Sequence, residues 1–327
     1  MEIFYPAYYK DFHCIAADCP DSCCKEWTVD IDPETAGYYL SLPGSLGDTL
    51  RSVITQEDAA FAMTIQNGRC PMWQQDGLCR IQAELGHDAL CQTCREFPRL
   101  RHDYGDFVEL GLELSCPEAA RLILVCDTSD LVCVTQVGNF QPEYDSQDMA
   151  FLRSARETFF SYLDTTEDTP AEILAMLLNY GIALQRQFDG GESAQLPIKP
   201  VLPKVAVSPA PLFAYFETLE ILTPQWQKLL KLPPKQARFP AQTKALVRYF
   251  LQRHWLQAIS DYDLLGRICF CVIACIIIGS VDIPTHRAAQ LFSKEIENNT
   301  ENLYALLDGV YNQSTLSPEQ LFSLLHQ

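Results

Sequence analysis

From about Asp148 onward, apolar residues recur at the spacing of an amphipathic helix. Thr169-Pro170-Ala171-Glu172 has the pattern of a capping box with proline at the first helical position, and a long apolar run follows it. The same pattern predicts further helices at 211–231, 241–260, 263–280, 285–297 and 300–312, and a last one after Ser317-Pro318-Glu319. This half of the chain is therefore predicted to be mainly helical.

The proline-rich segment 190–211 interrupts this pattern. It contains five prolines, which lack a backbone N–H group and are disfavoured inside helices and sheets. We therefore expect a linker, or a loop that crosses a surface.

The first 133 residues have shorter segments and more turn residues. Asp32-Pro33-Glu34-Thr35 and Ser115-Cys116-Pro117-Glu118 both read as helix starts, with an acidic side chain in the first turn. Short strands are predicted at 107–114 and 131–137, where β-branched and aromatic residues alternate loosely with polar ones. The predicted fold is mainly α. It consists of a small mixed α+β cysteine-rich N-terminal module over residues 1–135 and a helical C-terminal domain over residues 136–327.

The net charge of the chain indicates which classes of partner it can bind. Its 327 residues hold 24 Lys and Arg against 42 Asp and Glu, a net charge of −18, and residues 1–133 alone carry −13. A field of this sign repels phosphate backbones, so we expect no nucleic-acid binding. It attracts basic partners, including protein segments that present lysines.

The chain is expected to be cytoplasmic and to lack a membrane span. The most apolar run, Ile268–Ile278, is well short of the roughly 20 residues that cross a bilayer, and it predicts a core helix instead. The first residues have no basic region followed by an apolar core, so no secretory signal is predicted.

Cysteine is the most informative residue type, because eleven of the fourteen cysteines lie in residues 1–133. In a reducing compartment, thiols at this density bind metal or do redox chemistry more often than they form disulfides. The alternative is a set of buried free thiols that pack as small hydrophobic groups. We expect the Cys269, Cys271 and Cys275 group to be of that packed kind, inside an apolar helix.

Close spacing lets several thiolates reach one centre. The predicted metal ligands are eight cysteines: Cys19, Cys23, Cys24, Cys70, Cys79, Cys91, Cys94 and Cys116. Cys116 also sits at a predicted helix N-terminus, which stabilises a thiolate. One zinc ion or one cubane cluster needs four ligands, so either two centres exist or some thiols have other roles. The spacing alone suits both an iron–sulfur cluster and zinc.

The order CxxxCC, GRCP, GLCRI, LCxTCRxFPR and LSCPEAARLIL resembles the flagellin lysine N-methylase family of bacteria, over about residues 3–126. The core of the pattern also resembles small domains thought to chelate zinc or iron. The family resemblance implies methyl transfer from S-adenosylmethionine to lysine amines of flagellin, by an enzyme with a 4Fe-4S iron–sulfur cluster. The alternative is a non-enzymatic protein that chelates or delivers zinc or iron.

Methyl transfer to lysine has chemical requirements that the sequence meets only in part. The amine must lose its proton before it attacks the sulfonium methyl group. Asp30, Glu109, Glu113 and Tyr8 lie near the cysteine motifs in sequence, and none is singled out as the base. Arg95 and Arg99 are candidates to bind the carboxylate of the methyl donor, the alternative being ion pairs within a very acidic module. No glycine-rich nucleotide loop follows a strand, which argues against a Rossmann-type methyltransferase.

Overall fold

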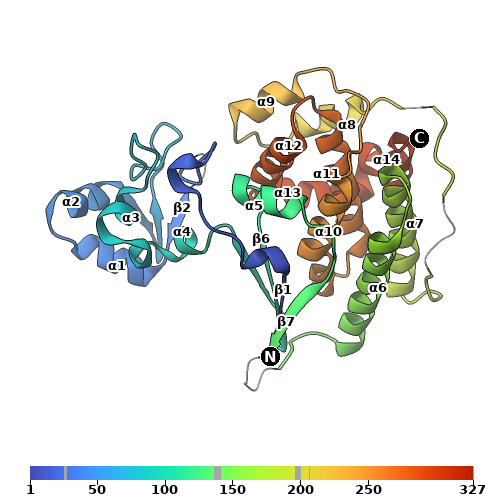
Figure 1. Ribbon diagram of the computed structural model, residues 1–327, viewed down its shortest axis with the longest axis horizontal. Helices are drawn as coiled ribbons and strands as arrows, with labels where there is room; N and C mark the ends of the chain where they lie inside the picture. The colour runs from blue at the N-terminus through green and yellow to red at the C-terminus, as the bar shows by residue number, and fades with distance from the viewer. Residues whose placement is uncertain (26–27, 136–140, 196–199, 206, 327) are drawn as a thin grey trace. The chain divides into compact units, whose positions relative to one another are not determined.

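The structure is a computed structural model that describes residues 1–25, 28–135, 141–195, 200–205 and 207–326 (Figure 1). The chain forms two compact units. The smaller contains His13–Leu100 and Cys116–Glu118, and the larger contains Met1–Phe12, Arg101–Ser115 and Ala119–Gln327. Residues 1–135 are therefore shared between the two units, because Met1–Phe12, Arg101–Ser115 and the residues from Ala119 onward belong to the larger one.

The smaller unit combines a three-stranded antiparallel sheet with short helices. The strands β2 (Val29–Ile31), β4 (Ala60–Met63) and β3 (Ile54–Glu57) lie in the order β2-β4-β3. The helices are α1 (Pro33–Ser41), α2 (Gly44–Val53), α3 (Arg80–Leu85) and α4 (Gln92–Glu96). Their apolar core includes Leu50, Tyr39 and Met72, and also the cysteines Cys70 and Cys91.

A mixed four-stranded sheet, in the order β5-β6-β1-β7, begins the larger unit. Its strands are β5 (Arg99–Asp103), β6 (Phe107–Leu112), β1 (Glu2–Pro6) and β7 (Leu131–Thr135). β1 runs parallel to β6, with Phe4 opposite Glu109, and antiparallel to β7. Both predicted strands are present, although residues 136 and 137 of the second lie outside the described part of the chain.

Helices make up the rest of the larger unit, as predicted. They are α5 (Pro117–Leu124), α6 (Ser146–Thr165), α7 (Pro170–Phe188), α8 (Ala210–Phe216), α9 (Pro224–Leu230), α10 (Thr243–His254), α11 (Leu264–Ser280), α12 (Thr285–Phe292), α13 (Thr300–Asn312) and α14 (Pro318–Leu324). In the proline-rich segment 190–211, the described residues before Ala210 form no helix or strand. The mainly α fold with a small mixed N-terminal part is confirmed.

Local helix-start chemistry operates where the sequence predicted it. The Thr169 side chain accepts a hydrogen bond from the Glu172 backbone N–H, and Glu172 accepts one from the Thr169 backbone N–H, which completes the capping box of α7. The single helix predicted over 211–231 is wrong. Two helices form there, because Thr223 caps a new helix that begins at Pro224.

The core of the larger unit surrounds α11, which contacts α7, α10 and α13. The aromatic rings of Phe250, Phe270 and Phe292 pack edge-on or tilted against one another, with centroids 5.7 to 6.0 Å apart. Cys269, Cys271 and Cys275 are buried in α11, so the prediction that they pack in a core helix is confirmed.

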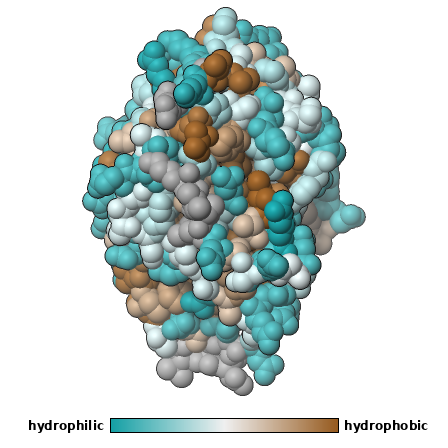
Figure 2. Space-filling model, turned by 90° about the vertical axis from the view of Figure 1, so that its right-hand side faces the viewer, coloured by the Kyte–Doolittle hydropathy of each residue, from teal (hydrophilic) through white to brown (hydrophobic). Residues whose placement is uncertain are grey.

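Among the residues that the structure describes, no helix is both long enough and apolar enough to cross a bilayer. On the face drawn in Figure 2, hydrophobic side chains form several separate groups among hydrophilic ones.

Candidate metal centre

Two pairs of cysteines form hydrogen bonds between their side chains. Cys23 and Cys24 are neighbours in the chain, whereas Cys91 precedes α4 and Cys94 lies one turn into it. The hydrogen bond from Cys23 lowers the pKa of Cys24 to about 7, and the hydrogen bond from Cys94 lowers the pKa of Cys91 to about 7. Each pair therefore holds one thiol that is readily ionised near neutral pH, the form that binds metals.

The two pairs lie close enough to interact with each other. The pKa of Cys94 is raised first by its hydrogen bond to Cys91, and the charges of Cys91, Cys24 and Cys23 raise it further. Cys23 and Cys94 are both exposed residues. Four thiols from two distant parts of the sequence therefore lie near one another, and two of them are exposed.

Cys70 and Cys79 lie near these pairs, and each follows a similar turn. A glycine with positive φ stands two residues before each cysteine, Gly68 at +72° and Gly77 at +84°. The backbone N–H of Cys70 donates to the carbonyl of Cys24 over 2.7 Å. Burial raises the pKa of Cys70 to about 12, with a contribution from the Cys24 charge, so Cys70 favours the neutral thiol.

The other predicted ligands differ in their surroundings. The charges of Cys14 and Cys116 both raise the pKa of Cys23, which places these two thiols near the first pair. Cys14 is not among the eight predicted ligands. Cys19 is partly exposed, after the short helical turn Ala16–Asp18, and whether it binds metal stays a prediction.

The donor chemistry suits an iron–sulfur cluster or zinc, since both are held by thiolates. In the described part of the chain, no three Cys, His, Asp or Glu side chains are arranged to hold a metal ion as they stand. Binding would therefore require the thiols to leave their mutual hydrogen bonds and turn toward a shared centre. Which of the eight predicted cysteines do so stays a prediction.

The carboxylate of Asp32 joins two helix starts beside the cysteine pairs. One oxygen accepts from the Thr35 backbone N–H in α1, and the other accepts from the Gln92 backbone N–H at the start of α4, both over 2.9 Å. These hydrogen bonds, that from Gln92 foremost, lower the pKa of Asp32 to about 2. Asp32 thereby positions the helix that carries Cys94.

Replacing Asp32 with alanine is expected to destabilise the protein by about 1 to 2 kcal/mol, because one side chain caps two helices. Denaturant unfolding followed by circular dichroism measures this. Thr169→Ala, which removes the cap of one helix, is the matched comparison and should cost about 1 kcal/mol. An Asp32→Ala protein as stable as the wild type would show that the bridge between α1 and α4 contributes nothing.

The remaining predicted site residues are dispersed. Arg95 is exposed, and its guanidinium donates to the nearby Leu90 carbonyl over 3.4 Å. Arg99 is exposed on β5. Donor binding by Arg95 and Arg99 stays a prediction. Asp30 is exposed on β2, beside an open hollow of about 360 Å³ that Asp32 and Glu96 also line.

Glu109, Glu113 and Tyr8 belong to the larger unit. Glu109 is buried in an ion pair with Arg156, and Glu113 accepts a hydrogen bond from the Ser115 hydroxyl over 2.9 Å. Tyr8 lies near Cys126, and burial raises its pKa well above the usual value. None of the three is placed as a free base.

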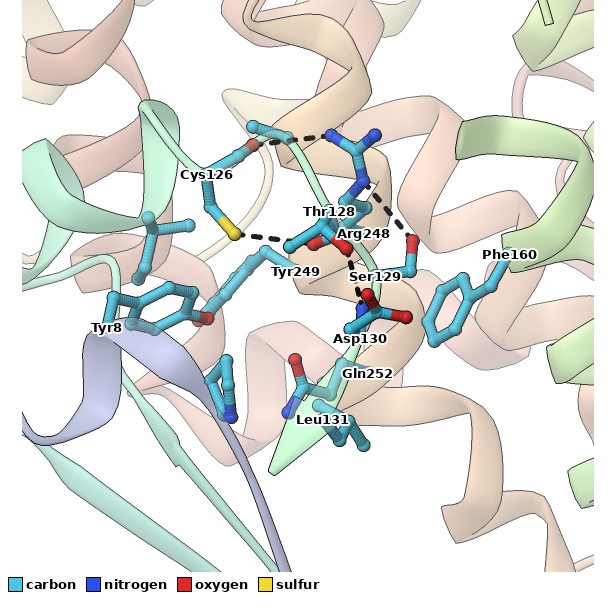
Figure 3. Close-up of a pocket in the computed structure, with 13 residues that line it drawn as sticks. Tyr8, Cys126, Thr128, Ser129, Asp130, Leu131, Phe160, Arg248, Tyr249 and Gln252 are labelled. Carbon is cyan, nitrogen blue, oxygen red and sulfur yellow. Dashed lines mark hydrogen bonds between the residues drawn. The ribbon is translucent and has the colours of Figure 1, made fainter. Parts of the chain in front are cut away.

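A narrow cavity beside Tyr8 has room for about one water molecule, at roughly 10 Å³ (Figure 3). The Cys126 thiol donates to the Thr128 carbonyl over 3.3 Å, and the Cys126 carbonyl accepts from Arg248. The buried amide nitrogen of Gln252 has no hydrogen-bond partner among the described residues. The cavity is suited to a structural water rather than a substrate.

A buried polar network in the larger unit was not predicted from the sequence. The carboxylate of Glu297 accepts from Tyr249 over 2.9 Å and from His254 over 2.7 Å, and it lies 3.3 Å from Arg253. The members come from α10 and from the π-helical turn Ser293–Glu297, which are far apart in sequence. Only the tertiary structure brings them together.

Comparisons with known proteins assign the chain to a family. No family model matches it, and no solved structure matches it. Two proteins named lysine-N-methylase, from Salmonella typhimurium and Salmonella choleraesuis, are each 32% identical to it, over 158 and 157 residues. These matches cover 43% of this chain and 38% of each relative, so the matched region spans well under half of the relatives' length. The flagellar biosynthetic protein FliU of Salmonella muenchen is 35% identical over 131 residues, which cover 36% of this chain and 75% of that protein. The resemblance of the cysteine motifs is thus confirmed, and the chain belongs to the flagellin lysine N-methylase family.

Proposed function

We propose that this protein is an S-adenosylmethionine-dependent protein-lysine N-methyltransferase that acts on flagellin and holds an iron–sulfur cluster in its cysteine-rich unit. The observation that carries the proposal is the meeting of the Cys23–Cys24 and Cys91–Cys94 pairs in a member of this family. The names of the relatives support lysine methylation and a flagellar substrate.

The four paired thiols would hold the cluster, with Cys70, Cys79, Cys116 and Cys19 as further candidates. When bound, such a cluster supplies a reversible one-electron couple. The readily ionised thiols Cys24 and Cys91 favour binding, because thiolate rather than thiol is the ligand. Zinc is the alternative metal, since it takes the same ligands.

The charge of the smaller unit would attract the substrate. Asp30, Asp32 and Glu96 line the open hollow beside α4, the helix that carries Cys94. Three carboxylates favour a lysine ammonium there, but they also raise its pKa. Methyl transfer would therefore need local desolvation of the amine or a positioned base before the nitrogen attacks the sulfonium methyl group.

The proposal is tested on anaerobically purified, reduced protein, incubated with isotope-labelled S-adenosylmethionine and flagellin. We expect a brown protein and lysines of flagellin that gain labelled methyl groups, detected by mass spectrometry. Cys23→Ala should abolish metal binding and methylation together. The control Cys133→Ala removes an exposed thiol on β7, outside the cysteine pairs, and should change neither.

Each departure from this result has its own meaning. Stoichiometric metal without methylation would favour a metal-handling protein. A colourless protein that contains zinc would show that the metal is zinc rather than an iron–sulfur cluster, and it would leave the methyltransferase proposal standing. Methylation that survives loss of the metal in Cys23→Ala would show that the metal has no part in the reaction.

A further inference from the structure

A cavity of about 500 Å³ lies within the larger unit, between α6 and strands of its sheet. Phe4 of β1 and Glu109 of β6 line it from the sheet, and they are register partners on neighbouring strands. Arg153, Arg156 and Phe160 line it from α6. Its volume falls within the range of sites that bind small molecules and cofactors.

A buried ion pair forms a fixed part of the cavity wall. Arg156 donates to one oxygen of Glu109 over 2.9 Å and contacts the other oxygen with its second nitrogen. Both side chains are less than one tenth exposed, and the charges compensate each other. Because the two side chains neutralise each other, the pair shapes the cavity wall but leaves no charge free for a ligand.

Arg153 differs from Arg156, because its charge is not matched by an acid. Its guanidinium lies 4.7 Å from the centre of the Phe107 ring and 5.3 Å from that of Phe4. In the described ranges of the chain, no carboxylate lies within ion-pair distance of it. The rings hold the planar group in place, and its donors are available to a carboxylate.

Acidic side chains lie elsewhere on the wall. Glu157 is on α6 and Asp130 is in the segment before β7, and both are exposed. The neighbouring Ser129 is held by Asp164, which accepts from its backbone N–H over 3.0 Å and from its hydroxyl over 2.9 Å. The cavity thus offers one arginine for an anionic group and separate carboxylates for a cationic group.

Phe160 contributes an apolar ring to the wall of the cavity. Its side chain is almost fully buried, and Arg156 lies over its ring at 5.7 Å. A ring of this kind suits a planar aromatic group or a sulfonium cation. Together these features match a ligand with a carboxylate, an ammonium group and a larger aromatic part.

We propose that this cavity binds a zwitterionic amino-acid nucleoside, with Arg153 contacting its carboxylate and Glu157 its ammonium group. S-adenosylmethionine has this chemistry, so the inference rests on the proposed function and specifies where the methyl donor binds. It places the donor in the larger unit, with Arg153 in the role that the sequence suggested for Arg95 and Arg99.

Isothermal titration calorimetry of the intact, metal-loaded protein tests this without measuring activity. The probes are S-adenosylmethionine, S-adenosylhomocysteine and 5′-methylthioadenosine, which lacks the amino-acid part. Arg153→Met keeps the apolar stem but removes the donors, and it should weaken binding of the first two roughly 10- to 100-fold. Binding of 5′-methylthioadenosine should not change.

Two further variants make the test independent of folding and of general charge. Glu157→Gln changes an exposed residue and should weaken the same two probes roughly 2- to 5-fold. The control Arg186→Met removes an exposed arginine on α7 and should have no effect. Thermal unfolding followed by circular dichroism identifies any variant that fails to fold.

Several outcomes would overturn the inference. They are a wild-type protein that binds none of the probes, unchanged affinities in Arg153→Met and Glu157→Gln, and a loss seen in Arg95→Met alone, which would place the donor on the smaller unit. A wild-type protein that binds the probes but methylates no flagellin would instead refute the proposed function and leave the binding site in place.

Discussion

Replacing Glu297 with alanine is expected to destabilise the larger unit by about 3 to 5 kcal/mol, the usual cost of removing one partner of a buried ion pair. The Glu297 side chain is fully buried, and it accepts from Tyr249 and His254 and pairs with Arg253. Without it, the nearest carboxylate to Arg253 among the described residues is that of Glu113, 3.9 Å away. A buried guanidinium would be left poorly compensated.

Denaturant unfolding of Glu297→Ala measures this cost, and Glu192→Ala provides the control. Glu192 is exposed in the segment after α7, and its loss should change the free energy of unfolding by less than about 0.5 kcal/mol. Equal stability of the two variants would contradict the prediction.

The ionisation of Glu297 should also make the free energy of unfolding depend on pH in the acidic range. Burial opposes ionisation of Glu297, but the charge of Arg253 and the hydrogen bond from His254 outweigh it, so the net pKa is lowered. Its contribution to stability is therefore complete above the pKa of a glutamate in the unfolded chain and is lost as the pH falls through the lower folded value. Glu297→Gln should flatten the fall in unfolding free energy over this acidic range.

Local chemistry explains which parts of the fold were predictable. Thr169 and Asp32 begin helices through contacts with residues three positions away, so their roles are visible in the sequence. The strand β1 was not predicted, because it depends on pairing with β6 about a hundred residues later, with Glu2 opposite Phe107. Thr223-Pro224 begins α9, but in the sequence it lies within one long apolar segment, which was therefore predicted as a single helix.

In the candidate sites too, features set by local spacing were predictable and those set by tertiary structure were not. Spacing grouped the cysteines, and the structure places the Cys23–Cys24 and Cys91–Cys94 pairs together. Cys133 is not one of the predicted ligands, and the structure places it exposed on β7, an edge strand of the sheet. The cavity beside Arg153 was not predictable, since its wall combines three strands and a helix that only the tertiary structure brings together.

Removing the proposed metal is expected to cost more folding free energy than any of the substitutions above. The loss should be confined to the smaller unit. Cys70 and Cys91 belong to the apolar core of that unit, alongside Tyr39, Leu50 and Met72. Its helices are short and α4 spans only Gln92–Glu96, so the core contributes less than it would in a larger domain. For structural metal sites the binding free energy, on the order of 10 kcal/mol, is also folding free energy.

We therefore expect chelation of the reduced, metal-loaded protein to expose backbone amides of α1 and α4 to hydrogen exchange, while those of α7 and α11 stay protected. Mass spectrometry of proteolytic fragments resolves these segments. The α11 core consists of packed aromatic and aliphatic side chains and needs no metal, which makes it an internal reference in every sample. Cys23→Ala should show exposed α1 and α4 before any chelator is added, and no further change afterwards. Equal protection of α4 in the metal-loaded and chelated wild type would mean that the apolar core alone holds the smaller unit together.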